Sequence, residues 1–213
     1  MSETPADQPS DAPSGPPAGA ASRKASLRRE LLAARAALTP RELADSAAAL
    51  ARTALTLPEL SGARTVAAYV SVGREPGTRA LLDALRARGV RVLLPVLLPD
   101  DDLDWAVYEG PDLLLGAGRG LLEPGGPRLG AAAVLDADAV LLPGLAADDR
   151  GMRLGRGGGS YDRVLARLTA ARAHPALVVL LYGHEVVARI PSEPHDHPVD
   201  AVVTPAGTHR FGR

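Results

Sequence analysis

The chain of 213 residues contains no cysteine. This absence excludes a disulfide framework, a cysteine-ligated zinc or iron–sulfur site and a cysteine nucleophile. Aromatic residues make up only 3% of the sequence, so we expect a core built mainly from Leu, Val and Ala. No apolar run reaches transmembrane length, and the N-terminus lacks the basic and then apolar pattern of a signal peptide. We therefore expect a cytoplasmic protein with no membrane partner.

An excess of charge of either sign is also missing. The formal net charge is −1 at pH 7, and no basic face interleaved with aromatic residues is visible, so we expect no nucleic-acid partner. Lysine is scarce, because Lys24 is the only lysine among 24 Lys and Arg residues. Ammonium and guanidinium groups are not equivalent as point charges. Lys24 is therefore either a group required as lysine or a remnant of the bias toward arginine.

Hydrophobic periodicity divides the chain into a tail and one domain. Residues 1–22 are rich in Pro and Ala and lack Leu, Ile, Val and aromatic residues, which predicts disorder. One domain is expected over residues 23–207, with a tail at 208–213. The predicted helices cover 27–38, 40–54 after a capping box at Thr39, 79–88 after Thr78, 161–168 after Ser160, and 184–188. The predicted strands cover 65–72, 90–98, 103–108, 139–142, 176–182 and 201–204. This alternation predicts an open, mostly parallel α/β sheet with helices on both faces and a ligand at the carboxyl ends of its strands.

A glycine-rich segment, residues 148–163, follows a predicted strand and leads into a predicted helix. Glycines allow backbone N–H groups to approach an anion, the helix N-terminus adds partial positive charge, and Arg153 and Arg156 add bidentate donors. The segment therefore predicts a phosphate site. It is neither a Walker A loop nor a dinucleotide fingerprint, whose third glycine position holds Ser160 here. The alternative is a flexible glycine turn with solvated arginines.

Three acidic residues are further candidates. Asp162 lies in the first turn of a predicted helix, where it either complements the helix dipole or binds magnesium beside phosphates. Asp196 lies between His195 and His197; a transition-metal site there lacks a third ligand, so a second magnesium carboxylate is the more economical interpretation. Glu75 follows the first predicted strand and either binds the amide-like edge of a heterocycle or is a solvated loop charge.

Four segments in order resemble the 5-formyltetrahydrofolate cyclo-ligase (5,10-methenyltetrahydrofolate synthetase) family, over about residues 23–205. Residues 24–28 resemble its K-x-x-L-R segment, and residues 71–78 its loop with a substrate-binding Glu. Residues 142–163 resemble its PGLAFD…G-x-RLG-x-G-x-GYYDR signature, and residues 190–200 its terminal P-x-E-x-HD-x-x-VD segment. Residues 120–124 resemble its G-I-x-EP element. The chain departs from the family pattern at Ala147, Ser160 and Glu185, where Phe, Tyr and Gln are usual.

The resemblance implies a three-layer α/β sandwich with Rossmann-like topology. It also implies an enzyme that uses ATP and Mg²⁺ to convert 5-formyltetrahydrofolate into 5,10-methenyltetrahydrofolate, ADP and phosphate through an iminophosphate. The implied catalytic residues are Lys24, Arg153 and Arg156. The implied ATP-binding residues are Lys24, Arg28, Arg153, Leu154, Gly155, Arg156, Gly157, Gly158, Gly159, Ser160 and Tyr161. The implied folate-binding residues are Val70, Glu75, Arg156, Gly157, Gly158, Gly159 and Ser160. The implied magnesium ligands are Asp162 and Asp196.

Two other functions stay open at the level of sequence. One is an ATP-dependent ligase or kinase that acts on a different small amide or acid, because Ser160 and Ala147 remove usual aromatic residues. The other is a non-catalytic folate- or nucleotide-binding protein of the same fold. We expect a monomer. Whether Asp148 or Asp149 assists the metal is a further open question.

Overall fold

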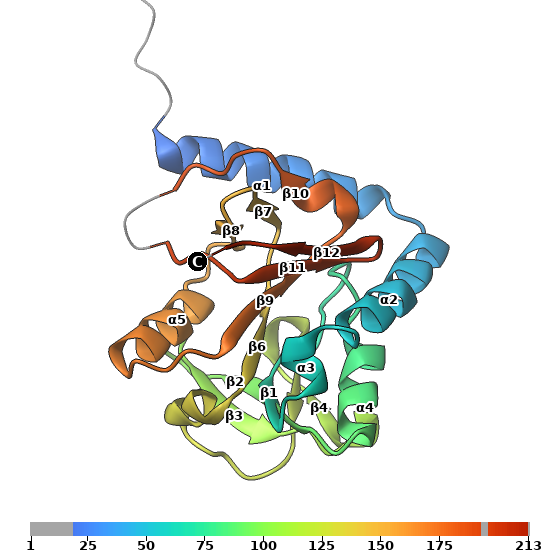
Figure 1. The fold of residues 1–213 in the computed structure, drawn as a ribbon, viewed down its shortest axis with the longest axis vertical. Helices are drawn as coiled ribbons and strands as arrows, with labels where there is room; N and C mark the ends of the chain where they lie inside the picture. The colour runs from blue at the N-terminus through green and yellow to red at the C-terminus, as the bar shows by residue number, and fades with distance from the viewer. Residues whose placement is uncertain (1–18, 193–195, 213) are drawn as a thin grey trace, which may run out of the picture.

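A seven-stranded sheet forms the centre of the protein, in a computed structural model that describes residues 19–192 and 196–212. Figure 1 shows its strands in the order β12 (Gly207–Arg210), β11 (Ala201–Thr204), β9 (Ala176–Leu180), β6 (Ala139–Pro143), β1 (Thr65–Ala67), β2 (Arg91–Leu97) and β3 (Leu103–Val107). The inner strands β11, β9, β6, β1 and β2 are parallel, and both edge strands are antiparallel to their neighbours. The predicted mostly parallel sheet is confirmed.

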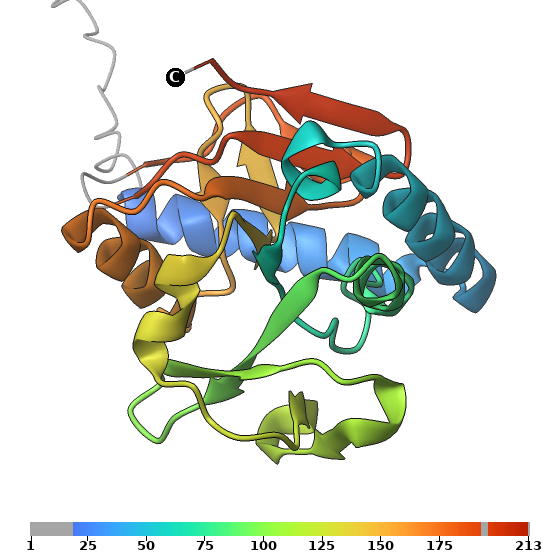
Figure 2. The ribbon, with the colours of Figure 1, turned by 60° about the horizontal axis from the view of Figure 1, so that its bottom comes forward.

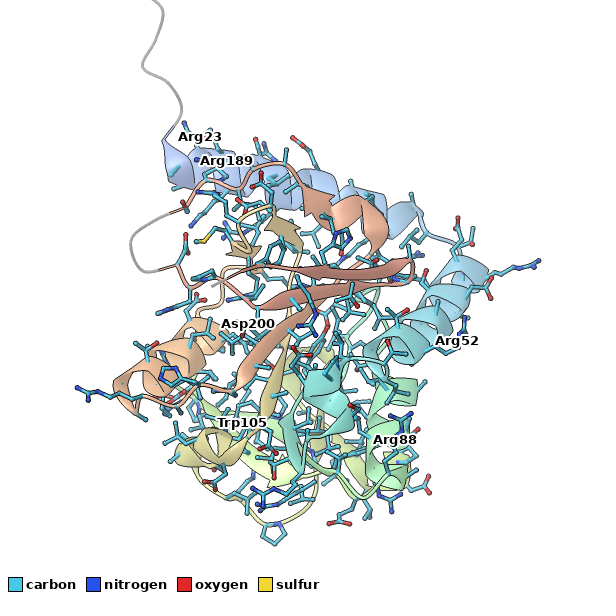
Figure 3. All side chains as sticks on the ribbon, viewed as in Figure 1. Arg23, Arg52, Arg88, Trp105, Arg189 and Asp200 are labelled. Atoms are coloured by element: carbon cyan, nitrogen blue, oxygen red, sulfur yellow. The ribbon has the colours of Figure 1, made fainter. Side chains whose placement is uncertain are left out.

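Helices cover both faces of this sheet, because side chains alternate between the faces along each strand. Leu141 of β6 packs in one apolar cluster with α2 (Pro40–Ala54), α3 (Pro58–Ser61) and α4 (Arg79–Ala87). Its neighbours Val140 and Leu142 pack in the opposite cluster with α5 (Ser160–Ala170) and the 3-10 helix η3 (Ala131–Asp136). The single tryptophan, Trp105 on β3, is fully buried in the second cluster (Figure 3). The three-layer α/β architecture is confirmed.

Helix α1 (Ala20–Ala37) lies outside the main sheet, against a small one. That sheet has the order β10 (Val186–Val187), β7 (Ala146–Asp148) and β8 (Arg153–Leu154). Leu31 of α1 packs in one cluster with Leu145, Leu154 and Ile190. Figure 1 shows α1 running across the top of the molecule beside β7, β8 and β10. The N-terminal helix is thereby placed next to the glycine-rich segment, far away in sequence. No helix among the described residues is long and apolar enough to cross a membrane.

Local signals fix several helix ends as predicted. The Thr39 hydroxyl accepts the Glu42 N–H at 3.2 Å, the Glu42 carboxylate accepts the Thr39 N–H at 2.7 Å, and α2 begins at Pro40. Gly89, which follows the C-cap residue Arg88 of α4, has a φ of +79° as a C′ glycine does. Thr78 is the N-cap residue of α4, but its side chain makes no capping hydrogen bond. Its hydroxyl instead donates to the Tyr69 carbonyl at 2.8 Å and accepts the Ser71 N–H at 2.9 Å, which ties the chain after β1 to α4.

Other predicted boundaries are wrong. The strand predicted over 65–72 ends at Ala67, and the chain after it is irregular. Ser160 is the first residue of α5 rather than its cap, which is Gly159 at a φ of +79°. The region 184–188 holds a 3-10 turn, η4 (Gly183–Glu185), followed by β10 instead of a helix. Helix α1 begins at Ala20, inside the region that was predicted to be disordered; residues 1–18 lie outside the described residues.

Short strands without an apolar run were missed. Residues 207–210, predicted mostly as a tail, form β12 and pair with β11. The predicted loop 143–159 contains β7 and β8. The irregular region 111–130 contains the turns η1 (Pro111–Leu113) and η2 (Gly118–Gly120) and the hairpin of β4 (Leu114–Gly116) and β5 (Leu122–Pro124), which Figure 2 shows at the bottom of the molecule. Such segments are stabilised by pairing with neighbours, not by their own patterns.

Candidate functional site

The order of the parallel strands places a crevice at the carboxyl ends of β1 and β6. If the five parallel strands are numbered along the chain, their order in the sheet is 2-1-3-4-5. The connection from β1 therefore leads to its neighbour β2 on one side, and the connection from β6 leads to β9 on the other side. The segments that follow the two strands are residues 68–78 and 144–162. Ligands of open α/β sheets bind at such a reversal point. Two adjoining cavities lie there.

The larger cavity has a volume of about 380 Å³. One wall follows β1, a second comes from β2, β3 and the β4–β5 hairpin, and a third is the end of β6 with the glycine-rich segment. Its lining residues are Tyr69, Val70, Val72, Glu75, Pro95, Leu97, Asp101, Leu103, Arg119, Leu121, Leu122, Glu123, Pro143, Gly144, Arg153, Gly155, Arg156, Gly157, Gly158, Gly159, Ser160, Tyr161 and Asp162.

Polar groups in this cavity point to a ligand with hydrogen-bonding groups. Glu75 is largely buried; one oxygen accepts the Val72 N–H at 2.9 Å, and the other lies 3.3 Å from Nε of Arg156. The hydroxyl groups of Tyr69 and Tyr161 are buried and have no partner among the described residues. Burial raises the pKa of both phenols well above the usual range, and the charge of Glu75 raises it further, so both stay neutral donors. Unsatisfied buried donors are costly, and a bound ligand would satisfy them.

The smaller cavity, of about 180 Å³, lies between α1 and the glycine-rich segment. Nζ of Lys24 is 2.8 Å from Oδ2 of Asp196, and both side chains are largely buried. Arg28, one turn further along α1, donates from Nε to the Gly155 carbonyl at 2.9 Å. The lining residues are Ala21, Lys24, Arg28, Arg153, Leu154, Gly155, Gly157, Asp162 and Asp196.

Arg153 lines both cavities and is almost fully buried. It donates to the Pro143 carbonyl at 3.2 Å and to Oδ1 of Asp162 at 2.8 Å, whereas its Nε has no partner among the described residues. Desolvation lowers the pKa of Arg153, and the Asp162 carboxylate opposes that effect. A Cβ atom at Gly155 would lie 2.8 Å from Nη1 of Arg153, so a side chain there would displace the guanidinium from its present position. Each sequence-predicted site residue lines one or both cavities; their roles remain predictions.

The carboxylates predicted to bind metal come together in the smaller cavity. Asp162 and Asp196 both line it beside the cations. Among residues 19–192 and 196–212, no three His, Asp or Glu side chains gather to form a metal site. His195 lies outside the described residues, so the His-x-His alternative is not tested. Two carboxylates are a donor set suited to Mg²⁺ that completes its shell with phosphate oxygens and water.

Asp148 has a different task from that of Asp162. Its buried carboxylate accepts the N–H groups of Arg150 and Met152 on Oδ1, both at 3.0 Å, and that of Ile190 on Oδ2 at 3.0 Å. The Arg150 guanidinium lies 2.6 Å from Oδ2. Asp148 therefore closes the turn after β7 onto the chain at Ile190, and its oxygens are occupied by protein donors. Asp149 is exposed.

We expect Asp148→Asn to lower the free energy of unfolding at pH 7 by about 2–4 kcal/mol, because buried donors lose a charged acceptor. Burial alone would raise the pKa of Asp148, but the hydrogen bonds from Ile190, Arg150 and Met152 outweigh it and lower the pKa. This contribution is complete above the unfolded-state pKa of about 4 and disappears as pH falls through the lower folded-state pKa. Urea unfolding from pH 7 to pH 3 measures it, with exposed Asp149→Asn as control. A deficit that does not shrink in acid would contradict the assignment.

Comparison with known proteins identifies the family. The model of the 5-formyltetrahydrofolate cyclo-ligase family matches residues 20–205. The chain belongs to this family. It is 42% identical over 187 residues to a 5-formyltetrahydrofolate cyclo-ligase of Mycolicibacterium smegmatis, covering 85% of this chain and 93% of that protein. It is 35% identical over 179 residues to the Escherichia coli protein of that name, covering 81% and 94%. The structure of 5,10-methenyltetrahydrofolate synthetase from Aquifex aeolicus superposes with a TM-score of 0.75 at 28% identity, covering 89% and 94%.

Family membership makes the chain an enzyme, a ligase of folate metabolism, and confirms the resemblance drawn from its motifs. Two of the departures from the family pattern have different surroundings in the fold. Ser160 lines the larger cavity, whereas Ala147 is fully buried in the core with α5 and lies outside both sets of lining residues. The replacement of the usual Phe by Ala147 therefore affects the packing of the core. Of these two departures, only Ser160 in place of the usual Tyr changes the wall of the larger cavity.

Sequence reasoning missed several lining residues. Tyr69 lies within the strand predicted over 65–72, directly before the predicted site residue Val70, and this position could have identified it. Asp101 and Arg119 lie in turns of segments that lack periodic patterns, and only the fold brings them to the cavity.

Proposed function

We propose that this enzyme converts 5-formyltetrahydrofolate and ATP into 5,10-methenyltetrahydrofolate, ADP and phosphate, with Mg²⁺ bound. The observation that carries the proposal is the meeting of two cavities at one glycine-rich segment, with Arg153 in the wall of both. A ring-bearing substrate fits the larger cavity, and a polyphosphate fits the smaller, cationic one. A group transferred between them must pass the segment that they share.

Several observations support phosphate binding in the smaller cavity. Lys24, Arg28 and Arg153 supply three positive charges, and Nε of the buried Arg153 lacks a partner among the described residues. A Cβ atom at Gly158 or Gly159 would meet nothing within 4 Å, so backbone there borders open space in front of α5. Helix N-termini favour anions. ATP would bind with its phosphates among these groups.

The carboxylate pair supports a magnesium ion at the same place. We propose that Asp162 and Asp196 hold Mg²⁺ when ATP is bound, because both face the cavity that would receive the phosphates. The ion would supply charge neutralisation at the transferred phosphoryl group. In the structure Arg153 and Lys24 contact these carboxylates at 2.8 Å, so the cations hold the ligands in place.

The chemistry requires positioning more than a strong acid or base. The formyl oxygen, an amide oxygen and a weak nucleophile, attacks the γ-phosphorus while the bond to the ADP oxygen breaks. N10 of the folate then attacks the formyl carbon and loses its proton, and phosphate leaves with the former formyl oxygen. Lys24, Arg153 and Arg156 would stabilise the negative charge that shifts during both steps. Glu75, held by the Val72 N–H, would orient the pterin through its amide-like edge.

The test mixes the purified enzyme with 5-formyltetrahydrofolate and MgATP and follows the absorbance of the methenyl product. We expect product formation that stops without ATP or after EDTA, and recovers when Mg²⁺ is restored. Folded protein that binds ATP but yields no product would contradict the proposal. In that case, phosphate release with other small amides or acids would favour a different ligase or kinase. Thermal stabilisation by folate without phosphate release would favour a non-catalytic binder.

A further inference from the structure

Two residues at the mouth of the larger cavity have backbone conformations that side chains rarely adopt. Among the described residues, the only non-glycine residues with positive φ are Asp101 at 64°, Arg119 at 61° and Arg172 at 52°. Asp101 lies in the turn between β2 and β3, and Arg119 lies in the β4–β5 hairpin. Both line the larger cavity, and Nη1 of Arg119 is 3.0 Å from Oδ1 of Asp101. The fold therefore holds this pair across the opening between two separate turns.

The ion pair does not account for the strain. The side chains of Arg119 and Asp101 are 73% and 45% exposed. An ion pair as exposed as this contributes about 0–1 kcal/mol, whereas each residue held in this backbone region costs about 1–3 kcal/mol. The hairpin turn accounts for the conformation of Arg119, because Arg119 and Gly120 both have positive φ and lie in a turn closed by the Leu121 N–H on the Gly118 carbonyl at 3.2 Å. This turn presents the Arg119 guanidinium to the cavity.

Among the described residues, Arg119 is also the one cation that lines this side of the cavity. The wall made by β2, β3 and the β4–β5 hairpin holds Asp101, Glu123 and Arg119 as its charged lining residues. Glu123 accepts the Leu97 N–H at 2.9 Å and so serves the backbone. The other lining cations, Arg153 and Arg156, belong to the glycine-rich segment. If a ligand places its reacting group at the glycine-rich segment, Arg119 is the lining cation that can bind an anionic group at the opposite end of that ligand.

We propose that Arg119 binds a carboxylate of the glutamate tail of the substrate, and that this carboxylate replaces Asp101 as its partner. The inference rests on the proposed function, because a folate has its reacting formyl group and its glutamate carboxylates at separate places. With the formyl group at the glycine-rich segment, the tail leaves through the mouth, where Arg119 stands. A guanidinium binds a carboxylate bidentately, and the released Asp101 is exposed enough to be solvated by water.

The test measures dissociation constants by calorimetry, without ATP, for 5-formyltetrahydrofolate and for the matching pteroic acid amide, in which a neutral amide replaces the glutamate and no carboxylate remains. We expect Arg119→Asn to weaken binding of the folate about fivefold to tenfold relative to the amide. Asn tolerates the left-handed conformation, so this change removes the charge and keeps the backbone. Arg119→Lys should retain part of the preference, and Asp101→Asn should strengthen folate binding because it removes the competing carboxylate. Added salt should reduce all these differences.

Several results would overturn the assignment. Equal loss for the two compounds would mean that Arg119 acts through the structure of the hairpin, and no loss would mean that the tail lies elsewhere. Weaker folate binding in Asp101→Asn would mean that the pair itself is needed. Failure of the unsubstituted enzyme to bind either compound, together with absent turnover, would reject the proposed function as well. Turnover with no change in the ratio of dissociation constants would reject only the role of Arg119.

Discussion

Replacing Lys24 by Met is expected to lower kcat/KM for the cyclo-ligase reaction by about a hundredfold to a thousandfold, the usual cost of removing one group that stabilises transition-state charge. The ammonium lies in the smaller cavity, 2.8 Å from Asp196, and only 9% of its side chain is exposed. A charge held in such a site is poorly screened by water, so its electrostatic effect is large. Met keeps most of the apolar stem and removes the charge. Steady-state kinetics with ATP varied at saturating folate measure kcat/KM.

Two control variants separate charge from folding. Arg29→Met removes a cation from the exposed face of the same helix, where Arg29 donates to the Ser26 hydroxyl at 3.0 Å, and should leave kcat/KM nearly unchanged. Lys24→Arg keeps the charge in a different shape and should recover part of the rate. Thermal unfolding should show that Lys24→Met remains folded. If Lys24→Met retains normal kcat/KM, Lys24 does not contact the phosphates.

The layers of the fold were predictable because they depend on patterns within single segments. Apolar runs and helix signals such as the Thr39 capping box and Gly89 are local, and together they gave the α/β alternation. Strands without such a run were missed. The polar strand β12 exists because it pairs with β11, and β7 and β8 exist because they pair with each other under α1. Pairing of this kind has no sequence signature within the segment itself.

The site was predictable where chemistry is concentrated in one segment. The glycines of residues 155–159, with Arg153 and Asp162 beside them, indicate anion binding on their own. How α1 meets this segment depends on tertiary packing of Leu31 with Leu145 and Leu154, which no spacing reveals. The contact of Asp101 with Arg119 likewise depends on two turns that the sheet brings together. The family motifs therefore identified the site residues, whereas the distances between residues of different segments depend on the tertiary fold and come from the structure alone.

A buried ion pair joins Arg35 of α1 to Glu185 of the turn η4, and breaking it is expected to give the largest loss of stability. Arg35 of α1 donates from Nε to Oε1 of Glu185 at 2.6 Å and from Nη2 to Oε2 at 3.0 Å. Nη2 also lies 2.6 Å from the carbonyl of Gly144, which lines the larger cavity. The two side chains are 2% and 0% exposed. Burial opposes the charge of Arg35, but its contacts with Glu185 outweigh burial and raise its pKa.

Arg35→Met should lower the free energy of unfolding by about 3–5 kcal/mol, because it leaves the Glu185 carboxylate buried without its cation. For a chain of this length, that loss lowers Tm by roughly 10 °C. Calorimetry and urea unfolding measure both quantities. Exposed Arg41→Met, which removes the arginine of the surface pair with Asp45, is the matched control and should cost less than about 1 kcal/mol.

The double variant Arg35→Met, Glu185→Gln tests the cause of the loss. Gln keeps an oxygen that can accept the Tyr182 N–H, which Glu185 accepts at 2.9 Å, but it carries no charge. If the loss of stability in Arg35→Met comes from the buried Glu185 carboxylate without its cation, the double variant should be more stable than Arg35→Met alone. We nevertheless expect kcat/KM of the double variant to be lower than that of the unsubstituted enzyme, because α1 then holds Lys24 and Arg28 without the link from Arg35 to Gly144. Full recovery of rate along with stability would show that packing of Leu31 suffices to position α1. If the stability losses of Arg35→Met and Glu185→Gln simply add in the double variant, the contribution of Glu185 to stability does not depend on its pairing with Arg35.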